Sequence, residues 1–233
     1  MCAATPRLRW RPNAQVLLLR RTAGSSRAPL AIVKFGGSHI GGPHIKPWLS
    51  AIANKAGAIV IVPGGGPFAE VVRSAQASLG YDDGAAHRMA LMAMAQFGRA
   101  LENLNPALRL AASRSAMWRA LKDGKVPVWS PEAMSTAAAL PETWALTSDS
   151  LSAWLAGELG ARNLLLVKHS RHEGAAVDVR RLVAEGVVDS LFPRYLKESG
   201  VRAWLAAPAE SARLAEGLRR PIFPEILASD ETT

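Results

Sequence analysis

Two glycine-rich turns follow the first two apolar runs of the chain, and both carry groups that can bind phosphate. Their residues are Lys34, Gly36, Gly37 and Ser38 in the first turn and Gly64, Gly65 and Gly66 in the second. Glycines allow backbone N–H groups to approach phosphate oxygens closely, and a lysine ammonium adds positive charge beside them. Either turn alone could be a tight turn without a ligand. Two such turns at successive strand ends, one of them with a lysine, favour phosphate binding.

Asp149 and Lys168 are the other charged residues placed where such a ligand is expected. Asp149 lies in the segment LTSDS at 146–150, at the start of an expected helix, where Thr147, Ser148 or Asp149 itself could cap the first backbone N–H groups. An acid at that place could also orient lysines beside a phosphate. Lys168 ends the fifth expected strand, either as a second cation for the ligand or as a solvated strand boundary.

The remaining motifs exclude several common kinds of catalytic site. The sequence contains no GxxxxGK[ST] element and no GxGxxG after an expected strand, so the phosphate site is neither a P-loop nor a dinucleotide-binding turn. No Ser-His-Asp or Cys-His arrangement is evident. His169 and His172 have the spacing of a metal-binding pair but lack a third ligand nearby, so we predict no metal bound by protein side chains.

Short apolar runs alternate with longer helical patterns and would position these residues. The expected strands are Leu30–Phe35, Ala58–Val62, Leu108–Ala112, Val126–Trp129, Asn163–Val167 and Val201–Leu205. The expected helices are Pro67–Leu79, Gly84–Leu104, Ser113–Lys122, Ser148–Leu159, Phe192–Glu198 and Ala209–Leu218, and Pro131–Pro141 is expected to be a loop. Most of the strands are apolar on both faces, as in a parallel sheet covered by helices. The alternation predicts an α/β fold, a three-layer αβα sandwich with a mainly parallel central sheet.

The helix expected at Gly84–Leu104 is unusually rich in methionine. Its apolar residues include Met89, Met92, Met94, Phe97 and Leu101. Methionine side chains are flexible and suit irregular cores and contact surfaces. This helix is therefore expected to contribute to the core or to a subunit interface rather than to a cofactor site.

Composition and charge limit the class of protein. The chain has 233 residues, of which 49% are hydrophobic and 20% charged, which suits one domain, placed at 28–233. Residues 1–27 contain six arginines and no acid, and we expect them to form a basic, disordered extension outside the fold. This extension supplies most of the net charge of +9. The rest of the sequence lacks the interleaved aromatic and basic residues that nucleic-acid binding uses.

Neither a membrane span nor a disulfide framework is compatible with the sequence. No apolar run is long enough to cross a membrane, and the one cysteine, Cys2, cannot form an internal disulfide. The cysteine content suits a reducing compartment. We therefore expect a cytoplasmic protein without a membrane or nucleic-acid partner.

Four segments together resemble the amino acid kinase superfamily. They are KFGGS at 34–38, PGGGPFA at 63–69, LTSDSLSAWLAGELGA at 146–161 and LLLVK at 164–168, and the resemblance covers about residues 29–226. It implies the amino acid kinase fold and an ATP-dependent kinase that acts with Mg²⁺ on a small anionic metabolite. It also implies a homo-oligomer.

The resemblance assigns a role to each of the residues above. Lys34 would bridge the donor and acceptor phosphates, and Asp149 would orient Lys34 and a second lysine, Lys168. The phosphate path would be lined by Gly36, Gly37 and Ser38, and the acceptor would be held by Gly64, Gly65 and Gly66. The sequence departs from the superfamily after Lys168, where residues 169–174 replace the usual DVDG-like turn and leave the contacts to the nucleoside undefined.

Two further segments narrow the resemblance. DDGAAHRMALMAMAQFG at 82–98 and EGVVDSLFPRYLKES at 185–199 are similar to the kinases of methanofuran biosynthesis, which convert [5-(aminomethyl)furan-3-yl]methyl phosphate to its diphosphate. Alternatives are a carboxylate or nucleoside-monophosphate kinase of the same superfamily, or a non-catalytic nucleotide or oxyanion storage protein. Asp82, Asp83 or Glu142 could bind the ammonium group of that substrate and Trp144 could face its furan, although caps, solvated charges and a buried indole are the preferred explanations for them.

Overall fold

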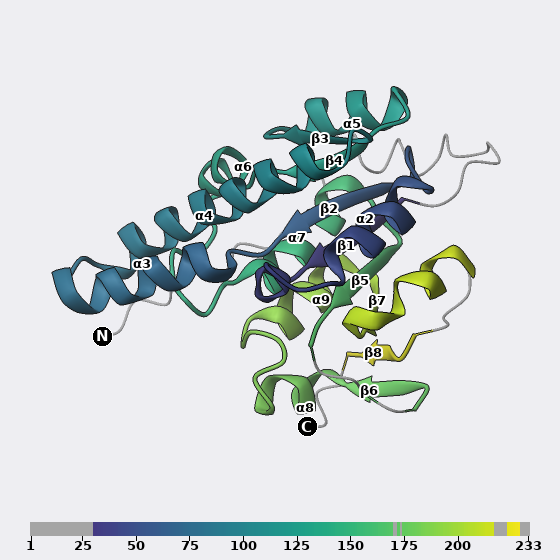
Figure 1. Ribbon diagram of the computed structural model, residues 1–233. Coiled ribbons are helices and arrows are strands. Elements are labelled where there is room, and N and C mark those ends of the chain that lie inside the picture. The colour runs from purple at the N-terminus through teal and green to yellow at the C-terminus, as the bar shows by residue number, and fades with distance from the viewer. Residues whose placement is uncertain (1–29, 170–171, 173, 217–222, 229–233) are drawn as a thin grey trace.

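The computed structural model describes residues 30–169, 172, 174–216 and 223–228, and in this part of the chain eight strands form one sheet (Figure 1). The strands are β1 (Ala31–Phe35), β2 (Ile59–Pro63), β3 (Leu108–Ala111), β4 (Val126–Trp129), β5 (Asn163–Val167), β6 (Ala176–Asp178), β7 (Arg202–Ala206) and β8 (Glu225–Leu227). Their order is β3-β4-β2-β1-β5-β7-β8-β6, and every pair is parallel except β7–β8. The predicted basic extension, 1–27, lies outside the described residues.

Helices cover both faces of this sheet. They are α2 (Ile45–Ala53), α3 (Gly66–Leu79), α4 (Asp83–Leu104), α5 (Arg114–Lys122), α6 (Glu132–Ala137), α7 (Ser148–Leu159), α8 (Val179–Ala184) and α9 (Phe192–Ser199), with 3₁₀ segments η1 (Gly37–His39) and η2 (Pro208–Glu216). The predicted three-layer αβα fold with a mainly parallel sheet is thus confirmed.

Two hydrophobic clusters fill the space between the layers. One cluster joins the sheet to α5, α7, α8 and α9, and the other joins it to α2 and η2. β1, β2 and β5 are buried along their whole length, because each lies between the two clusters and is apolar except for Lys34 in β1 and Asn163 in β5. The indole of Trp48 donates a hydrogen bond of 2.7 Å to the carbonyl of Pro208 and so ties α2 to η2.

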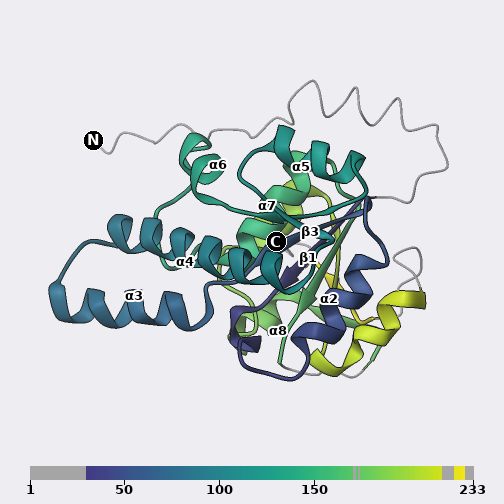
Figure 2. The same cartoon turned by 45° about the horizontal axis from the view of Figure 1, so that its top comes forward.

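Helices α3 and α4 run side by side and project beyond the sheet (Figures 1 and 2). Asp82 caps α4 by accepting a hydrogen bond from the backbone N–H of Ala85. The C-terminal part of α4 packs against the sheet, and its side chains Phe97 and Leu101 are buried in the core. The methionines of α4 differ in exposure: Met94 is buried, whereas Met89 and Met92 are exposed on the projecting part of the helix.

The structure corrects the sequence-based assignment at several places. Pro131–Pro141 was expected to be a loop but contains α6, a helix of 6 residues that begins directly after Pro131. Ala209–Leu218 was expected to be an α-helix, but Pro208–Glu216 forms 3₁₀ turns interrupted by a non-helical Glu210, and residues 217–218 lie outside the described part. The elements α2, α8, β6 and β8 were not predicted; α8, β6 and β8 offer too few residues for a clear periodicity, whereas α2 is as long as α5. No helix among the described residues is long and apolar enough to cross a membrane.

Candidate active site

The carboxyl ends of β1 and β5 bring two lysines to the same face of the sheet. The strands are parallel neighbours, and Lys34 lies opposite Leu166 in their register. Since side chains alternate along a strand, Lys34 points to the face of Ile32, which is the face covered by α7. Lys168, two residues after Leu166, continues on that same face.

Helix α7 brings a carboxylate between these lysines. Its first turn begins after Thr147, whose hydroxyl accepts a hydrogen bond from the backbone N–H of Asp149. The Lys34 Nζ lies 3.0 Å from Asp149 Oδ1, and the Lys168 Nζ lies 2.7 Å from Asp149 Oδ2. The structure therefore brings together the three charged residues that the sequence analysis singled out from segments far apart in the chain.

Two members of the charged cluster are buried, Lys168 is partly exposed, and the cluster has an excess of positive charge. Lys34 is 5% exposed and Asp149 is 4% exposed. Burial lowers the pKa of Lys34 to about 8, although the neighbouring carboxylate acts in the opposite direction. Burial alone would raise the pKa of Asp149, but the ammonium groups of Lys34 and Lys168 outweigh it and hold that pKa below its usual value. Two ammonium groups around one carboxylate attract an anionic ligand.

Asp189 holds the start of α7 in place, and sequence reasoning missed this residue. Its carboxylate accepts hydrogen bonds from the backbone N–H groups of Thr147 and Ser150 at 3.0 and 3.1 Å, and from both of their hydroxyl groups. Burial and the nearby charge of Asp149 raise the pKa of Asp189, while these hydrogen bonds oppose the rise. Asp189 lies about 40 residues after the first turn of α7, so no local motif could have revealed it.

The two glycine turns are packed against each other beside the charged cluster. The backbone N–H of Gly64 donates a 2.8 Å hydrogen bond to the carbonyl of Phe35. A Cβ atom placed on Gly37 would lie 2.1 Å from the backbone nitrogen of Gly66, and one on Gly66 would lie 2.4 Å from the Gly37 carbonyl oxygen. No real Cβ tolerates such contacts. Glycine is thus required for the contact between the turns.

The residues after β5 reach back to the first glycine turn. The His169 ring nitrogen Nε2 lies 3.2 Å from the Ser38 carbonyl oxygen, and its ring stacks on that of His39 at 4.3 Å. Burial lowers the pKa of His39 to about 4, so this ring is neutral and packs as a core residue. In the segment that replaces the DVDG-like turn, residues 170, 171 and 173 lie outside the described part of the chain.

Four candidates for contacts to an aminomethylfuran have partners within the protein. Asp83 accepts a hydrogen bond from Gln76 at 2.9 Å, Glu142 forms an ion pair with Arg88, and Asp82 is the cap of α4 described above. The Trp144 indole donates a 2.6 Å hydrogen bond to the Gln76 side chain and packs under the Arg73 guanidinium. Their described contacts are those of structural residues.

The charged cluster has no spare carboxylate for a metal ion. Each oxygen of Asp149 faces an ammonium group, and no group of three or more His, Cys, Asp or Glu side chains in the described ranges is arranged to hold a metal. Mg²⁺ commonly keeps its water ligands and binds through substrate phosphates. The residues present therefore fit Mg²⁺ that arrives on the phosphates of a nucleotide, and they do not form a protein site for it.

Comparisons with known proteins identify the family and the fold of the chain. A sequence model of the amino acid kinase family matches residues 29–171, which is more than half of the chain. A [5-(aminomethyl)furan-3-yl]methyl phosphate kinase of Methanocaldococcus jannaschii is 27% identical over 219 residues, which span 86% of this chain and 99% of that protein.

Solved structures share the fold. The uridylate kinase of Archaeoglobus fulgidus superposes with a TM-score of 0.67 at 15% identity, covering 85% of this chain and 100% of that one. The aspartate kinase of Synechocystis superposes with a TM-score of 0.61 at 14% identity, covering 88% of this chain and 40% of that one. The charged cluster, the paired glycine turns and the family match lead to one conclusion: this chain is a kinase that belongs to the amino acid kinase family.

Proposed function

We propose that this kinase transfers the γ-phosphoryl group of ATP to [5-(aminomethyl)furan-3-yl]methyl phosphate and forms the diphosphate. The observation that supports phosphoryl transfer is the pair of lysines around Asp149, the buried Lys34 and the partly buried Lys168, next to the two glycine turns. The choice of acceptor is supported by the similarity to the M. jannaschii kinase, which extends over 99% of that protein. A cytoplasmic location, where ATP is available, is part of the proposal.

The chemistry needs no general base. A phosphate monoester is already ionised near neutral pH, so one of its oxygens can attack the γ-phosphorus directly. A new P–O bond forms on the acceptor while the bond from the γ-phosphorus to the bridging oxygen breaks, and ADP leaves with that electron pair. Catalysis then depends on in-line positioning and on stabilising the charge of the transferred group.

Each residue of the cluster has a proposed part in this transfer. Lys34 bridges the donor and acceptor phosphates, Lys168 adds a second positive charge, and Asp149 holds both ammonium groups in position. Gly36, Gly37 and Ser38 line the path of the transferred group, and Gly64, Gly65 and Gly66 hold the acceptor. Mg²⁺ bound to ATP would neutralise part of the phosphate charge.

An ADP-release assay with a panel of acceptors tests the proposal. The panel contains [5-(aminomethyl)furan-3-yl]methyl phosphate, UMP, N-acetylglutamate and aspartate, each with ATP and Mg²⁺. We expect the highest kcat/KM with the aminomethylfuran phosphate and a diphosphate product in the ³¹P NMR spectrum. Higher kcat/KM with UMP or with a carboxylate would replace the proposed acceptor while keeping the kinase assignment.

A further inference from the structure

A series of rings connects the two strand ends that carry the lysines of the charged cluster. Phe35 directly follows Lys34 at the end of β1, and His169 directly follows Lys168 after β5. The ring of His39 lies between them, with its centre 5.0 Å from that of Phe35 and 4.3 Å from that of His169. These contacts join the ends of β1 and β5 in addition to the ion pairs that the lysines make.

The rings lie on the opposite face of the sheet from the ion pairs. Phe35 and Lys34 are neighbours in one strand, so their side chains point to opposite faces. Phe35 belongs to the hydrophobic cluster that joins the sheet to α2 and η2, where its ring centre lies 6.4 Å from that of Trp48. Trp48 is fully buried, whereas His169 is exposed. The series of rings therefore begins in the core and ends at the surface with His169.

The two histidines also fasten the first glycine turn to the end of β5. The Nε2 atom of His39 lies 3.2 Å from the carbonyl oxygen of Val167, and the Nε2 atom of His169 lies 3.2 Å from the carbonyl oxygen of Ser38. A carbonyl oxygen only accepts hydrogen bonds, so each ring donates from Nε2. One bond runs from the turn to the strand, and the other runs from the residue after the strand back to the turn.

The stack of His39 and His169 is free of charge repulsion. His39 is buried, and burial lowers its pKa to about 4, so its ring is uncharged near neutral pH. His169 is held at the surface by the stacking and by its hydrogen bond to Ser38. Because its side chain is exposed, its removal leaves the core intact, and its role can be tested in a folded protein.

We propose that His169 is a positioning residue for phosphoryl transfer, because it holds the turn at 36–38 at a fixed distance from Lys168 so that both meet the γ-phosphate of ATP. This inference rests on the proposed function, in which that turn lines the path of the transferred group. ADP lacks the γ-phosphate. Its binding should therefore depend less on His169 than the binding of ATP does.

The ring contact is tested in the full-length protein by NMR with isotope-labelled histidine. His169→Ala should shift the ring-proton signals of His39, because the ring current of the stacked imidazole is lost. His44→Ala removes a neighbouring histidine whose side chain makes no capping hydrogen bond, and it should shift these signals much less. Unshifted His39 signals in His169→Ala would overturn the stack and the proposal with it.

The functional consequence is tested by calorimetric titration with ATP and with ADP, each in the presence of Mg²⁺. We expect His169→Ala to raise the Kd of ATP by about tenfold and the Kd of ADP by less than about twofold, since one hydrogen bond and one ring contact are lost. An equal rise for both nucleotides would show a general disturbance of the site. Unchanged ATP binding would show that the turn is positioned without His169, and either result would overturn the proposal.

Two further substitutions separate the hydrogen bond from the stacking. His169→Gln keeps an N–H donor near the position of Nε2 but lacks the ring, and His169→Phe keeps a ring but lacks the donor. We expect each variant to recover part of the preference for ATP over ADP that His169→Ala loses. If neither binds ATP better than His169→Ala, these two contacts do not position the turn and the proposal is wrong.

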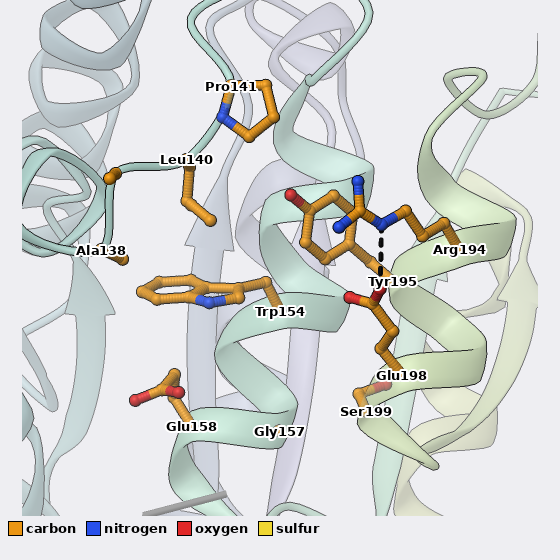
Figure 3. Close-up of a pocket in the computed structure, with 11 residues that line it drawn as sticks. Ala138, Leu140, Pro141, Trp154, Gly157, Glu158, Arg194, Tyr195, Glu198 and Ser199 are labelled. Carbon is orange, nitrogen blue, oxygen red and sulfur yellow. Dashed lines mark hydrogen bonds and ion pairs between the residues drawn. The ribbon is translucent and has the colours of Figure 1, made fainter. Parts of the chain in front are cut away.

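A variant at a distant place controls for a loss of stability alone. A cavity of about 320 Å³ lies between α7, α9 and the segment that follows α6, and Leu140 lies over the indole of Trp154 in its wall (Figure 3). None of the residues that line this cavity belongs to the glycine turns. Leu140→Ala should lower the melting temperature and keep the wild-type ratio of the two Kd values. A comparable loss of the preference for ATP in Leu140→Ala would overturn the assignment to His169.

Failure of this inference and failure of the proposed function give different results. The calorimetric titration needs no phosphate acceptor, so it measures the effect of His169 even if no compound of the acceptor panel is phosphorylated. A His169→Ala protein that binds ATP as tightly as the wild type would overturn the inference and leave the proposed acceptor unaffected.

Discussion

Asp149 organises the charged cluster at the scale of single residues. One of its oxygens faces Lys34 and the other faces Lys168, so the carboxylate fixes the separation of two ammonium groups that would otherwise repel each other. The cluster keeps a net positive charge after this pairing. Its electrostatics suit a ligand with several negative charges, such as the phosphates of ATP.

Removal of the Lys34 ammonium tests the role proposed for it. We expect Lys34→Ala to reduce kcat by about 10²–10³, because the charge on the transferred group loses its nearest cation. The far-UV circular dichroism spectrum should be unchanged. Lys46→Ala, which removes an exposed lysine of α2, is the control and should keep full activity. Near-normal turnover of Lys34→Ala would remove Lys34 from the mechanism.

The lowered pKa of Lys34 predicts a pH dependence. As the pH rises through about 8, the ammonium group of the free enzyme loses its proton and its positive charge. The kcat/KM should therefore fall above pH 8. Because bound phosphates favour the charged form, ATP binding near pH 8 should take up protons, which calorimetry in buffers of different ionisation enthalpy detects. Binding without proton uptake would show that Lys34 does not face the nucleotide phosphates.

At the scale of elements, the first turn of α7 depends on a residue from another part of the chain. Asp189 accepts hydrogen bonds from the backbone of both Thr147 and Ser150, on either side of Asp149. A helix start held in this way cannot rotate, and the Asp149 carboxylate stays between the two lysines. The cap thus couples the segment before α9 to the catalytic cluster.

Replacement of this cap should affect stability and activity together. We expect Asp189→Ala to lower the free energy of unfolding by about 1–2 kcal/mol and to reduce kcat by roughly tenfold to a hundredfold, through misplacement of Asp149. Asp178→Ala removes the corresponding cap of α8 and provides the control. It should lower stability without a comparable loss of kcat; equal loss of kcat in both variants would show a general rather than a local effect.

The sequence predicted the elements that carry the catalytic cluster. The observed bounds lie within one residue of the expected ones for β1, β4, β5, α3 and α7. Apolar runs and the glycines that end them are signals in the local sequence, so these elements can be predicted from it. Asp149 and Lys168 could be named from the sequence, but their ion pairs depend on the neighbouring positions of β1, β5 and α7. Asp189 and the contact between the glycine turns could not be predicted, since both depend on tertiary packing.

At the scale of the whole molecule, the projecting α3–α4 pair carries most of the large apolar side chains that are exposed among the described residues. They are Phe68, Val71, Leu79, Met89, Met92 and Leu104, with Leu227 elsewhere. Such a concentration is typical of a surface that contacts another protein. The sequence analysis left the methionine-rich helix between a role in the core and one in a subunit interface; its C-terminal half is in the core, and we propose that its exposed part forms, with α3, a subunit interface of a homo-oligomer.

Sedimentation velocity tests this assembly. We expect the protein to sediment as an oligomer, and Val71→Glu combined with Leu79→Glu to shift it towards the monomer, because two charges would be buried at the interface. Ser74→Glu combined with Ser78→Glu adds the same charge on exposed polar positions of α3 and is a control for net charge. A wild-type protein that sediments as a monomer at micromolar concentration would contradict the prediction.

The depressed basicity of the lysine at the end of β1 has a consequence for chemical labelling. At pH 7, the lowered pKa of Lys34 leaves its amine uncharged, and hence nucleophilic, more often than that of an ordinary lysine. Because Lys34 is only 5% exposed, an acylating reagent must be small to reach it, and bound ATP should slow the modification of Lys34 but not that of the exposed lysines. Mass spectrometry of the modified peptide would then report occupancy of the nucleotide site without any knowledge of the acceptor.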